Sequence, residues 1–499
     1  MNSKRILVIA GSDSSGGAGL EADQKVIAAH GCYAMTATTA LTAQNTQGVY
    51  DIHHTPSAFV RKQIDACIED IGVDVVKTGM LASASTIEVV ADALKEHNVP
   101  ISVVDPVMVS TSGAQLLPED AVETLIAKLL PLTTLLTPNL PEAQLILKRA
   151  GQAVGDPKRI DDIVSMAKAV KALGPKYVLL KGGHVPLTKE RVVPTGEADR
   201  QIVLNVLVGA EEDRIFETGY LKSRNTHGTG CSLASSGLDI AQAVKTANFY
   251  IEAGIRTSKD LGKGSGPINH FHSTYTLPFA PGRFLEYVLD REDVKGPWQE
   301  HTHHSFVQQL ADGTLPLGKF KNYLIQDYLF LIQFSRANAL AAYKAKNLDD
   351  INKSARIIQH IQEEMGLHIK YCEGFGLTKA EIESHEEHQA CTAYTRYVLD
   401  IGQSEDWFAL QIALMPCLIG YGHIARRLYD DQKTKREGNT YWNWVEQYVA
   451  EDYTDAVKAG LDIIERHAVL QSPSRIEQLV QIFIHATKME TGFWDMGTL

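Results

Sequence analysis

The stretch that indicates the fold of the first half of the chain is residues 5–30, which read RILVIAGSDSSGGAGLEADQKVIAAH. It opens on an apolar run at residues 6–10, as expected for a strand buried on both faces of a parallel sheet. A glycine-rich turn at 11–19 follows, and residues 20–30 have helical periodicity. The order of strand, glycine-rich turn and helix is typical of the first unit of an α/β fold.

The same alternation continues to about residue 180. Further apolar runs lie at 73–76, 101–104, 132–136 and 177–180, and helical patterns lie at 58–71, 84–97, 118–130 and 160–173. We therefore expect a mostly parallel sheet flanked by helices. Ligands bind outside the carboxyl ends of the strands in such sheets. The residues that directly follow each run, such as Asp105, Asn139 and Lys181, are therefore the first place to look for a site.

The last 200 residues have a different composition. Of 18 prolines, 15 lie before residue 300, as do 26 of 38 glycines, whereas all five tryptophans lie at or after Trp298. Prolines and glycines gather at 277–297, and the long segments beyond have helical periodicity with few breakers. We expect one domain at 1–275, a linker at 276–297 and an all-α bundle at 298–499.

Charge and hydropathy exclude two classes of partner. The 499 residues carry a formal net charge of −12 with no basic block, which argues against nucleic acid. No run reaches the roughly 18 apolar residues of a membrane span, and the amino terminus has no signal-peptide pattern. Six cysteines without a CxxC pair fit a reducing compartment. We expect a cytoplasmic protein that binds small molecules.

Residues 225–232, NTHGTGCS, suggest a phosphate site. Gly228 and Gly230 allow successive backbone N–H groups to point at one spot, and the helix that follows adds partial positive charge. This arrangement suits an anion hole for a transferring phosphoryl group, with Cys231 as a candidate base in the first helical turn. The alternative is a glycine-rich turn with a packed cysteine. For residues 11–19 the alternative to a ligand loop is a tight turn.

Segments along the first domain resemble, in order, the hydroxymethylpyrimidine/phosphomethylpyrimidine kinase (ThiD) family of the ribokinase superfamily. They are residues 11–19 with Asp23, then 43–46, 77–81, 105–108, 137–142, 181–184, 225–231 and 262–272. The resemblance covers about residues 3–275. It implies two successive transfers from Mg-ATP. The first goes to the hydroxymethyl oxygen of 4-amino-5-hydroxymethyl-2-methylpyrimidine, and the second to the resulting monophosphate.

The resemblance also implies roles for individual residues. The pyrimidine pocket would be lined by Gly11, Asp23, Gln44, Met80 and Val107, and ATP or its phosphates would be bound by Asn139, Lys181, Gly228 and Gly230. Gln44 offers both a donor and an acceptor to an aminopyrimidine edge. Glu142 completes an N-x-x-E motif that places a hydrated Mg²⁺. Cys231 stands where sugar kinases of the superfamily carry an aspartate base.

In the second domain, Cys417 and Tyr421 are four residues apart and therefore share one helix face. Such a phenol can orient a thiol, although a packed Cys–Tyr pair in the core is the alternative. Asp327 and Glu490 each lie in a strongly apolar helical stretch, where a carboxylate is costly unless it is paired or used. A buried glutamate can serve as an acid near neutral pH.

These residues resemble the thiaminase II (TenA) family, which has an all-helical haem-oxygenase-like fold. The resemblance runs from about Trp298 to the end of the chain. It implies that Cys417 is the nucleophile that adds to the pyrimidine ring, while Glu490 protonates a ring nitrogen and Asp327 holds the amino group. The aromatic box would consist of Phe330, Tyr394, Tyr421, Tyr448 and Phe493. Phe330 stands where some members carry tyrosine.

Three other features of the second domain are expected to be structural. Residues 301–304, HTHH, are expected on a solvated face. The histidines of His385-Glu386-Glu387-His388 are three residues apart rather than the four of a helical zinc motif. Cys372 and Cys391 are expected to pack in the core.

Both resemblances concern an aminopyrimidine, so we expect a bifunctional, homo-oligomeric enzyme of the fungal thiamin-salvage type. The helical domain would hydrolyse aminomethylpyrimidine or thiamin to hydroxymethylpyrimidine, and the first domain would phosphorylate that alcohol twice. The alternative is a pyridoxal-type kinase fused to a non-catalytic helical oligomerisation module.

Overall fold

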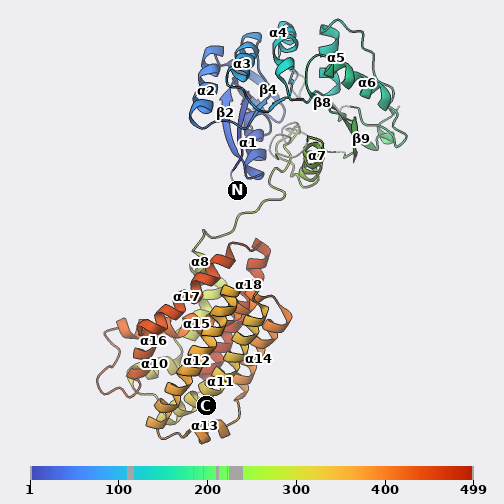
Figure 1. The fold of residues 1–499 in the computed structure, drawn as a ribbon. Helices are drawn as coiled ribbons and strands as arrows, with labels where there is room; N and C mark the ends of the chain where they lie inside the picture. The colour runs from blue at the N-terminus through green and yellow to red at the C-terminus, as the bar shows by residue number, and fades with distance from the viewer. Residues whose placement is uncertain are drawn as a thin grey trace. The chain divides into compact units, whose positions relative to one another are not determined.

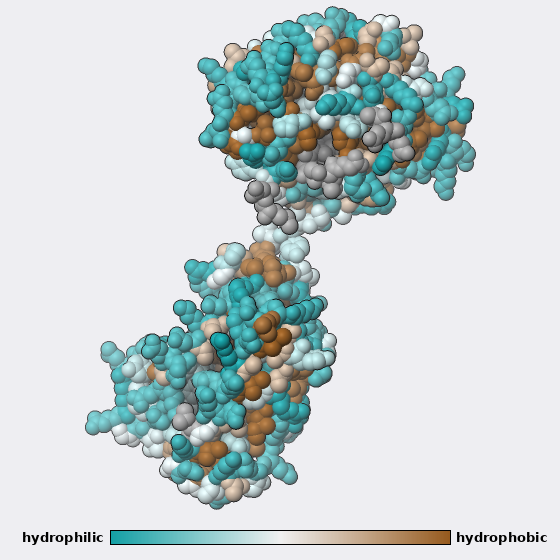
Figure 2. All heavy atoms as spheres, viewed as in Figure 1, coloured by the Kyte–Doolittle hydropathy of each residue, from teal (hydrophilic) through white to brown (hydrophobic). Residues whose placement is uncertain are grey.

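The computed structural model describes residues 3–108, 117–183, 185–194, 196–209, 213–221, 223 and 240–496. The chain folds as two compact units, one up to Thr274 and one from Tyr275 (Figure 1). Each has its own hydrophobic core. On the face of each unit seen in Figure 2, hydrophilic side chains cover most of the surface and apolar ones show in smaller groups.

The first unit is built on an eight-stranded sheet in the order β10-β9-β8-β7-β6-β5-β1-β2. The strands are β1 (Arg5–Ala10), β2 (Tyr33–Thr38), β5 (Val75–Thr78), β6 (Ser102–Val104), β7 (Leu135–Leu136), β8 (Tyr177–Leu180), β9 (Ile202–Val208) and β10 (Arg214–Gly219). The neighbouring strands β8, β7, β6, β5, β1 and β2 pair in parallel. Strand β9 is antiparallel to β8, and β10 is antiparallel to β9. Each predicted apolar run overlaps one of the parallel strands, although β5 and β7 share only two residues with their runs, and the parallel strand β2 was not predicted.

Helices cover both faces of this sheet, because side chains of β1 alternate between two cores. Leu7 and Ile9 belong to a core that also contains residues of α2 (Ser57–Asp70), α3 (Ala84–Glu96), α4 (Glu119–Thr124), α5 (Leu140–Arg149) and α6 (Ile160–Lys171). Ile6 and Val8 pack against α1 (Gly19–Ala29) and α7 (Ile240–Arg256) on the other face. A separate hairpin, β3 (Ala40–Asn45) and β4 (Gly48–His54), follows β2.

In the described part of the second unit, all elements of secondary structure are α-helices. They are α8 (Phe284–Asp290), α9 (Glu292–Thr302), α10 (Ser305–Asp312), α11 (Leu317–Lys344), α12 (Leu348–Gly374), α13 (Lys379–Ser384), α14 (Gln389–Ser404), α15 (Trp407–Asp430), α16 (Trp442–Val449), α17 (Glu451–Ala468) and α18 (Pro473–Asp495). Helix α15 contributes to both cores of the bundle. By length and composition it could cross a membrane, but 72% of its most apolar window is buried inside the bundle, as in a core helix of a soluble protein.

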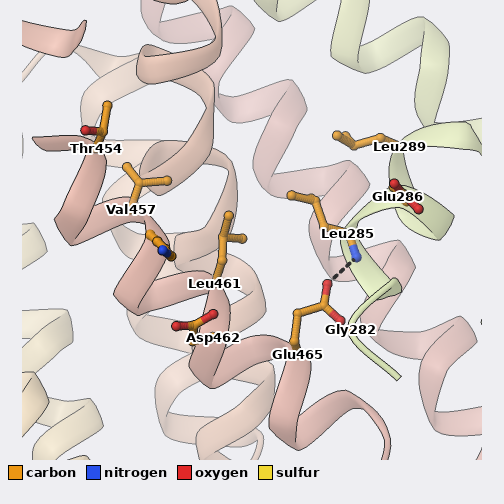
Figure 3. Close-up of a pocket in the computed structure, with 10 residues that line it drawn as sticks. Gly282, Leu285, Glu286, Leu289, Thr454, Val457, Leu461, Asp462 and Glu465 are labelled. Carbon is orange, nitrogen blue, oxygen red and sulfur yellow. Dashed lines mark hydrogen bonds between the residues drawn. The ribbon is translucent and has the colours of Figure 1, made fainter. Parts of the chain in front are cut away.

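The predicted linker at 276–297 is wrong over residues 284–297. Helices α8 and α9 occupy this range, and Phe284, Val288 and Trp298 are buried in the core of the second unit. The Glu465 carboxylate accepts hydrogen bonds from the backbone N–H groups of Phe284 and Leu285, each at 2.9 Å, and so joins the start of α8 to α17. Figure 3 shows the bond to Leu285. The composition misled because Gly282 ends the turn before α8 at a φ of 78°, while Pro297 lies inside α9.

Replacing Phe284 with alanine tests whether α8 belongs to the helical unit. Because Phe284 is 1% exposed, Phe284→Ala is expected to lower the free energy of unfolding of that unit by about 3–5 kcal/mol. Denaturant unfolding of the full chain, followed by the tryptophans, measures this change, since all of them lie at or after Trp298. Tyr343→Ala is the control, because Tyr343 is 86% exposed and its loss is expected to have little effect. An equally small effect of Phe284→Ala would contradict the assignment.

Candidate active sites

The glycine-rich loop after β1 is organised by the buried Asp13 carboxylate. It accepts hydrogen bonds from Ser15 N at 2.9 Å, Ser15 Oγ at 2.7 Å, Gly17 N at 3.1 Å and Ala18 N at 2.8 Å. Gly19 has a φ of 58°, and a Cβ there would lie 2.4 Å from the carbonyl oxygen of Gly11. The loop therefore folds back tightly onto the end of β1 and needs glycine at this position.

The structure brings most of the predicted pyrimidine-pocket residues together beside this loop. A Cβ at Gly11 would lie 2.3 Å from Cε of Met80, and Met80 packs in a small apolar cluster with Val107 and Ala40. Gln44 lies on β3, and two hydrogen bonds to Ser14 fix its backbone. The Gln44 N–H donates to Ser14 Oγ at 2.8 Å, and Ser14 Oγ donates to the Gln44 carbonyl oxygen at 2.7 Å. Gln44 therefore lies on the strand that also carries Ala40 of the apolar cluster, and its backbone is tied to the loop at Ser14.

Asp23, the remaining predicted pocket residue, forms a buried ion pair. Its Oδ2 lies 2.6 Å from Nζ of Lys77, and the two side chains are 1% and 5% exposed. Lys77 was not among the predicted site residues, although it lies in the segment that follows the second apolar run. The lysine compensates the charge that Asp23 would otherwise carry alone inside the fold.

A second polar group lies at the carboxyl ends of β6, β7 and β8. Asn139 caps α5, and its side chain accepts from Glu142 N at 2.9 Å while Glu142 Oε2 accepts from Asn139 N at 2.8 Å. The N-x-x-E motif is therefore a capping box in this structure. Lys181 pairs with Asn139 as a parallel bridge, and its Nζ lies 2.8 Å from Oδ1 of Asp105.

Burial raises the pKa of Glu142 from 4.5 to about 7, an effect that Lys181 opposes and Asp105 reinforces. From the sequence, Asp105 was a residue to consider at the end of a strand, but no role was assigned to it. Its position directly after an apolar run was the available signal. Two carboxylates in such a place are the hard oxygen ligands that Mg²⁺ prefers, and a bound cation would relieve the cost of ionising Glu142. The predicted residues Gly228, Gly230 and Cys231 lie outside the described residues.

In the helical unit the predicted residues converge around the carboxyl group of Glu490. Glu490 is 1% exposed, and Oε1 accepts a hydrogen bond from the Tyr394 hydroxyl at 2.8 Å. The Tyr421 hydroxyl lies 3.4 Å from Oε2, and the Cys417 side chain also hydrogen-bonds this carboxyl group. Burial raises the pKa of Glu490 to about 8, which Asp327 reinforces and these hydrogen bonds oppose. Glu490 is therefore largely protonated at neutral pH and is a ready proton donor.

Aromatic rings surround this group, as expected for an aromatic box. The centroids of Phe330 and Tyr394 are 5.1 Å apart, those of Phe330 and Phe493 are 5.5 Å apart, and those of Tyr421 and Tyr448 are 5.3 Å apart. The rings come from α11, α14, α15, α16 and α18. Stacked and edge-on faces of this kind suit a flat heteroaromatic ligand.

Asp327 lies in the same core and has a histidine beside it. Its carboxyl group is 8% exposed, and burial raises its pKa, an effect that His368 opposes. Nδ1 of His368, on α12, lies 3.7 Å from Oδ2 of Asp327. His368 was not among the predicted site residues, since no motif in the sequence marks it.

The prediction that residues 301–304 lie on a solvated face is wrong for His301 and Thr302, which are both buried. Trp494 Nε1 donates a hydrogen bond to His301 Nδ1 at 3.0 Å, and the Trp494 ring packs 5.3 Å from Tyr421. Burial lowers the pKa of His301 to about 3, so this histidine is neutral. His301 therefore contributes to the aromatic box indirectly, by holding the Trp494 ring that packs against Tyr421. Cys372 and Cys391 are fully buried, as predicted for packing residues.

The structure also has a surface groove of about 440 Å³ between α8 and α17. Leu285, Leu289, Val457 and Leu461 line it, with Glu286 and Asp462 among the polar residues at its side (Figure 3). None of the predicted site residues borders it. In the described ranges, no group of three or more His, Cys, Asp or Glu residues could hold a metal ion in either unit.

Comparison with known families agrees with this division. Residues 13–269 match the phosphomethylpyrimidine kinase family, and residues 291–498 match the TENA/THI-4/PQQC family. A Schizosaccharomyces pombe protein provisionally named hydroxymethylpyrimidine/phosphomethylpyrimidine kinase 2 is 42% identical over 98% of this chain and 90% of its own length. The chain belongs to the hydroxymethylpyrimidine/phosphomethylpyrimidine kinase family with a carboxy-terminal TENA/THI-4 domain.

Other relatives of this kinase family cover one or both units. The Saccharomyces cerevisiae hydroxymethylpyrimidine/phosphomethylpyrimidine kinase THI20 is 34% identical over 98% of this chain and 94% of its own length. A solved structure of phosphomethylpyrimidine kinase from Clostridium difficile is 37% identical, covers 50% of this chain and 98% of its own, and has a TM-score of 0.41. Both resemblances stated from the sequence are confirmed, as is the fold class of an α/β unit followed by a helical one.

The raised pKa of Glu490 predicts how stability depends on pH. The unfolded chain releases this proton near pH 4.5, whereas the folded TENA/THI-4 domain keeps it to about pH 8. Between these values the folded state binds more protons, so stability falls as pH rises, by at most about 1.4 kcal/mol per pH unit. Denaturant unfolding of the wild type and of Glu490→Gln across this window measures the difference. The wild type is expected to lose stability relative to the variant as pH rises, and parallel curves would exclude a buried neutral acid.

Proposed function

We propose that the α/β unit phosphorylates 4-amino-5-hydroxymethyl-2-methylpyrimidine and then its monophosphate with Mg-ATP. We also propose that the helical unit hydrolyses aminomethylpyrimidine or thiamin to the same alcohol. The observation that carries the second activity is the buried Glu490 carboxyl group, whose pKa is raised by burial and which Cys417 hydrogen-bonds. A cytoplasmic location, small-molecule partners and homo-oligomeric assembly belong to this proposal. The five cysteines of the described ranges are not in disulfides, which supports a reducing compartment.

For the kinase step, different residues near the carboxyl ends of the strands would bind the pyrimidine, the phosphates and the cation. The amide of Gln44 would accept from the pyrimidine amino group and donate to the adjacent ring nitrogen, above the floor of Gly11, Met80 and Val107. Lys181 would bind phosphate oxygens, and Asp105 and Glu142 would hold Mg²⁺ through water. The cation would neutralise charge on the transferring phosphoryl group. From the sequence, Cys231 would take the hydroxymethyl proton while Gly228 and Gly230 form the anion hole.

For the hydrolase step, the aromatic box would hold the pyrimidine ring against Cys417. The sulfur adds to a ring carbon while Glu490 gives its proton to a ring nitrogen, so that no charge accumulates on the ring. The thiol proton goes to the leaving amine, which departs from the exocyclic methylene carbon with the electrons of its C–N bond, and Glu490 takes back the proton from the ring nitrogen. Water then adds its oxygen to that carbon while the ring nitrogen is protonated again through Glu490. The sulfur leaves as the ring recovers its aromaticity, and the ring N–H proton returns to it as the thiol. Tyr394 and Tyr421 hold the Glu490 carboxyl group in place throughout.

Replacing Cys417 tests the hydrolase assignment. Incubation with aminomethylpyrimidine and Mg-ATP, followed by mass spectrometry, is expected to give the phosphorylated pyrimidine with the wild type. Cys417→Ala is expected to slow amine release by at least about 10³-fold, because the nucleophile is lost. Phosphorylation of supplied hydroxymethylpyrimidine should not change. Cys67→Ala is the control, since Cys67 is a half-buried cysteine on α2 of the α/β unit and should not affect amine release. Undiminished amine release by Cys417→Ala would rule out this mechanism.

Replacing Asp105 tests the phosphate end of the kinase site. Asp105→Asn removes one of two carboxylates and the partner of Lys181, so kcat for both phosphoryl transfers is expected to fall by roughly 10²-fold. Glu88→Gln removes a carboxylate from an exposed ion pair with Lys128 and is the control. Amine release by the helical unit should be unchanged in both variants. Cys231→Ala should let the alcohol accumulate. Equal kinase rates for Asp105→Asn and Glu88→Gln would exclude Asp105 from the site.

A further inference from the structure

Asp327 lies among groups that cannot balance its charge. Ionised Asp327 opposes ionisation of the surrounding acids, which are Tyr323, Tyr421, Glu490, Cys372 and Cys391, contributed by α11, α15, α18, α12 and α14. Each of these groups is either neutral or negative. A carboxylate that is 8% exposed among them is unfavourable unless a cation or a proton accompanies it.

His368 is the group beside Asp327 that can carry positive charge. Its Nε2 lies 2.9 Å from the carbonyl oxygen of Leu324, one turn before Asp327 on α11. Because a carbonyl oxygen only accepts, Nε2 carries a hydrogen and Nδ1 is left to face Oδ2 of Asp327 at 3.7 Å. The ring lies nearly parallel to that of Tyr328, with an interplanar angle of 26°. These contacts fix which nitrogen of His368 points at the carboxyl group.

A proton shared by this pair matters because of the ligand edge that Asp327 would meet. A 4-aminopyrimidine presents an amino donor next to a ring-nitrogen acceptor. A carboxylate can only accept, so it would satisfy the amino group but oppose the lone pair of the ring nitrogen. A carboxylic acid both accepts and donates, and therefore matches the two atoms. Nδ1 of His368 faces Oδ2 of Asp327, and one proton held by this pair leaves its net charge the same whichever of the two groups carries it.

We propose that His368 is a positioning residue of the helical site, which supplies Asp327 with the proton needed to pair with both atoms of the aminopyrimidine edge. This inference rests on the proposed hydrolase function. It assigns to α12 a part in recognising the amino group, whereas the bond-making residues come from α15 and α18. His368 acts through Asp327 and does not touch the reacting carbon.

The first test separates binding from chemistry. His368→Gln keeps a side chain that can donate to the Leu324 carbonyl but cannot carry a charge. It is expected to raise KM for aminomethylpyrimidine by about tenfold or more while changing kcat little, since one hydrogen bond in binding is lost. With an analogue in which a C–H group replaces the ring nitrogen next to the amino group, KM should be the same for the wild type and the variant, because the proton of Asp327 then has no acceptor. His385→Gln is the matched control, because His385 Nδ1 also bonds a backbone carbonyl, that of Glu381, on the exposed side of the unit.

The second test uses rescue. Asparagine at position 327 carries both a donor and an acceptor without needing a proton, so Asp327→Asn combined with His368→Gln is expected to recover most of the KM lost in His368→Gln alone. Losses that simply add in the double variant would overturn the proposal and leave His368 a packing residue. Thermal unfolding of each variant checks that the helical unit is folded. If Cys417→Ala leaves amine release unchanged, the hydrolase function itself fails, which is distinct from failure of the rescue.

Discussion

The arrangement of helices around the candidate site of the helical unit depends on the hydrogen bond that the Tyr394 hydroxyl donates to Glu490. A carboxyl group that is 1% exposed has lost its hydration, and only a proton or close donors make that position tolerable. Tyr394 on α14, Tyr421 and Cys417 on α15 and Glu490 on α18 must therefore meet at one point. The consecutive helices α14 and α15 and the more distant α18 are fixed relative to one another by this requirement. The aromatic rings then exclude water from the same point, which keeps the glutamate protonated.

The α/β unit manages its buried carboxylates in a different way. Asp23 and Asp105 each face a lysine, at 2.6 and 2.8 Å, and Glu142 is held by the cap of α5. Charges here are compensated by opposite charges at the ends of parallel strands, where backbone and side chains from several strands converge. Such a site suits phosphates and a divalent cation, whose own charges enter the balance. The helical site instead suits proton transfer, because its key group is neutral before the ligand arrives.

Five of the six parallel strands could be located from local patterns, whereas β2, the antiparallel strands β9 and β10 and the hairpin of β3 and β4 were not predicted. Uninterrupted apolar runs such as residues 6–10 indicate buried parallel strands, and the spacing of Cys417 and Tyr421 places both on one helix face. The resemblance to known families then selected Glu490 and Asp327. Residues that act across helices were missed, since His368 and His301 are defined only by what lies opposite them in the fold. Asp105 followed a predicted strand, but nothing distinguished it from the other residues there until Lys181 was found beside it.

The linker error has the same physical origin. Proline and glycine indicate a break in secondary structure when only the chain itself is considered, yet α9 contains Pro297 and α8 begins two residues after Gly282. Packing of Phe284 and Val288 into the core, together with the two hydrogen bonds to Glu465, outweighs the local preference. Burial of one apolar face stabilises a helix more than the low helix propensity of single residues destabilises it. A sequence pattern shows that propensity directly, but it does not show the surface of the fold against which the helix packs.

The two units also differ in how they would recognise the same aminopyrimidine edge. An amide such as that of Gln44 carries its donor and acceptor at every pH, so recognition by the kinase site needs no proton. Asp327 has the same pattern only when protonated, and its closest basic neighbour is His368. An amide suits a site that binds phosphates and a cation, because the electric field of these charges does not change which of its atoms donates and which accepts. The carboxyl group suits a site that must move protons to and from a ring, because the same proton that completes recognition also withdraws electrons from the ring that Cys417 attacks.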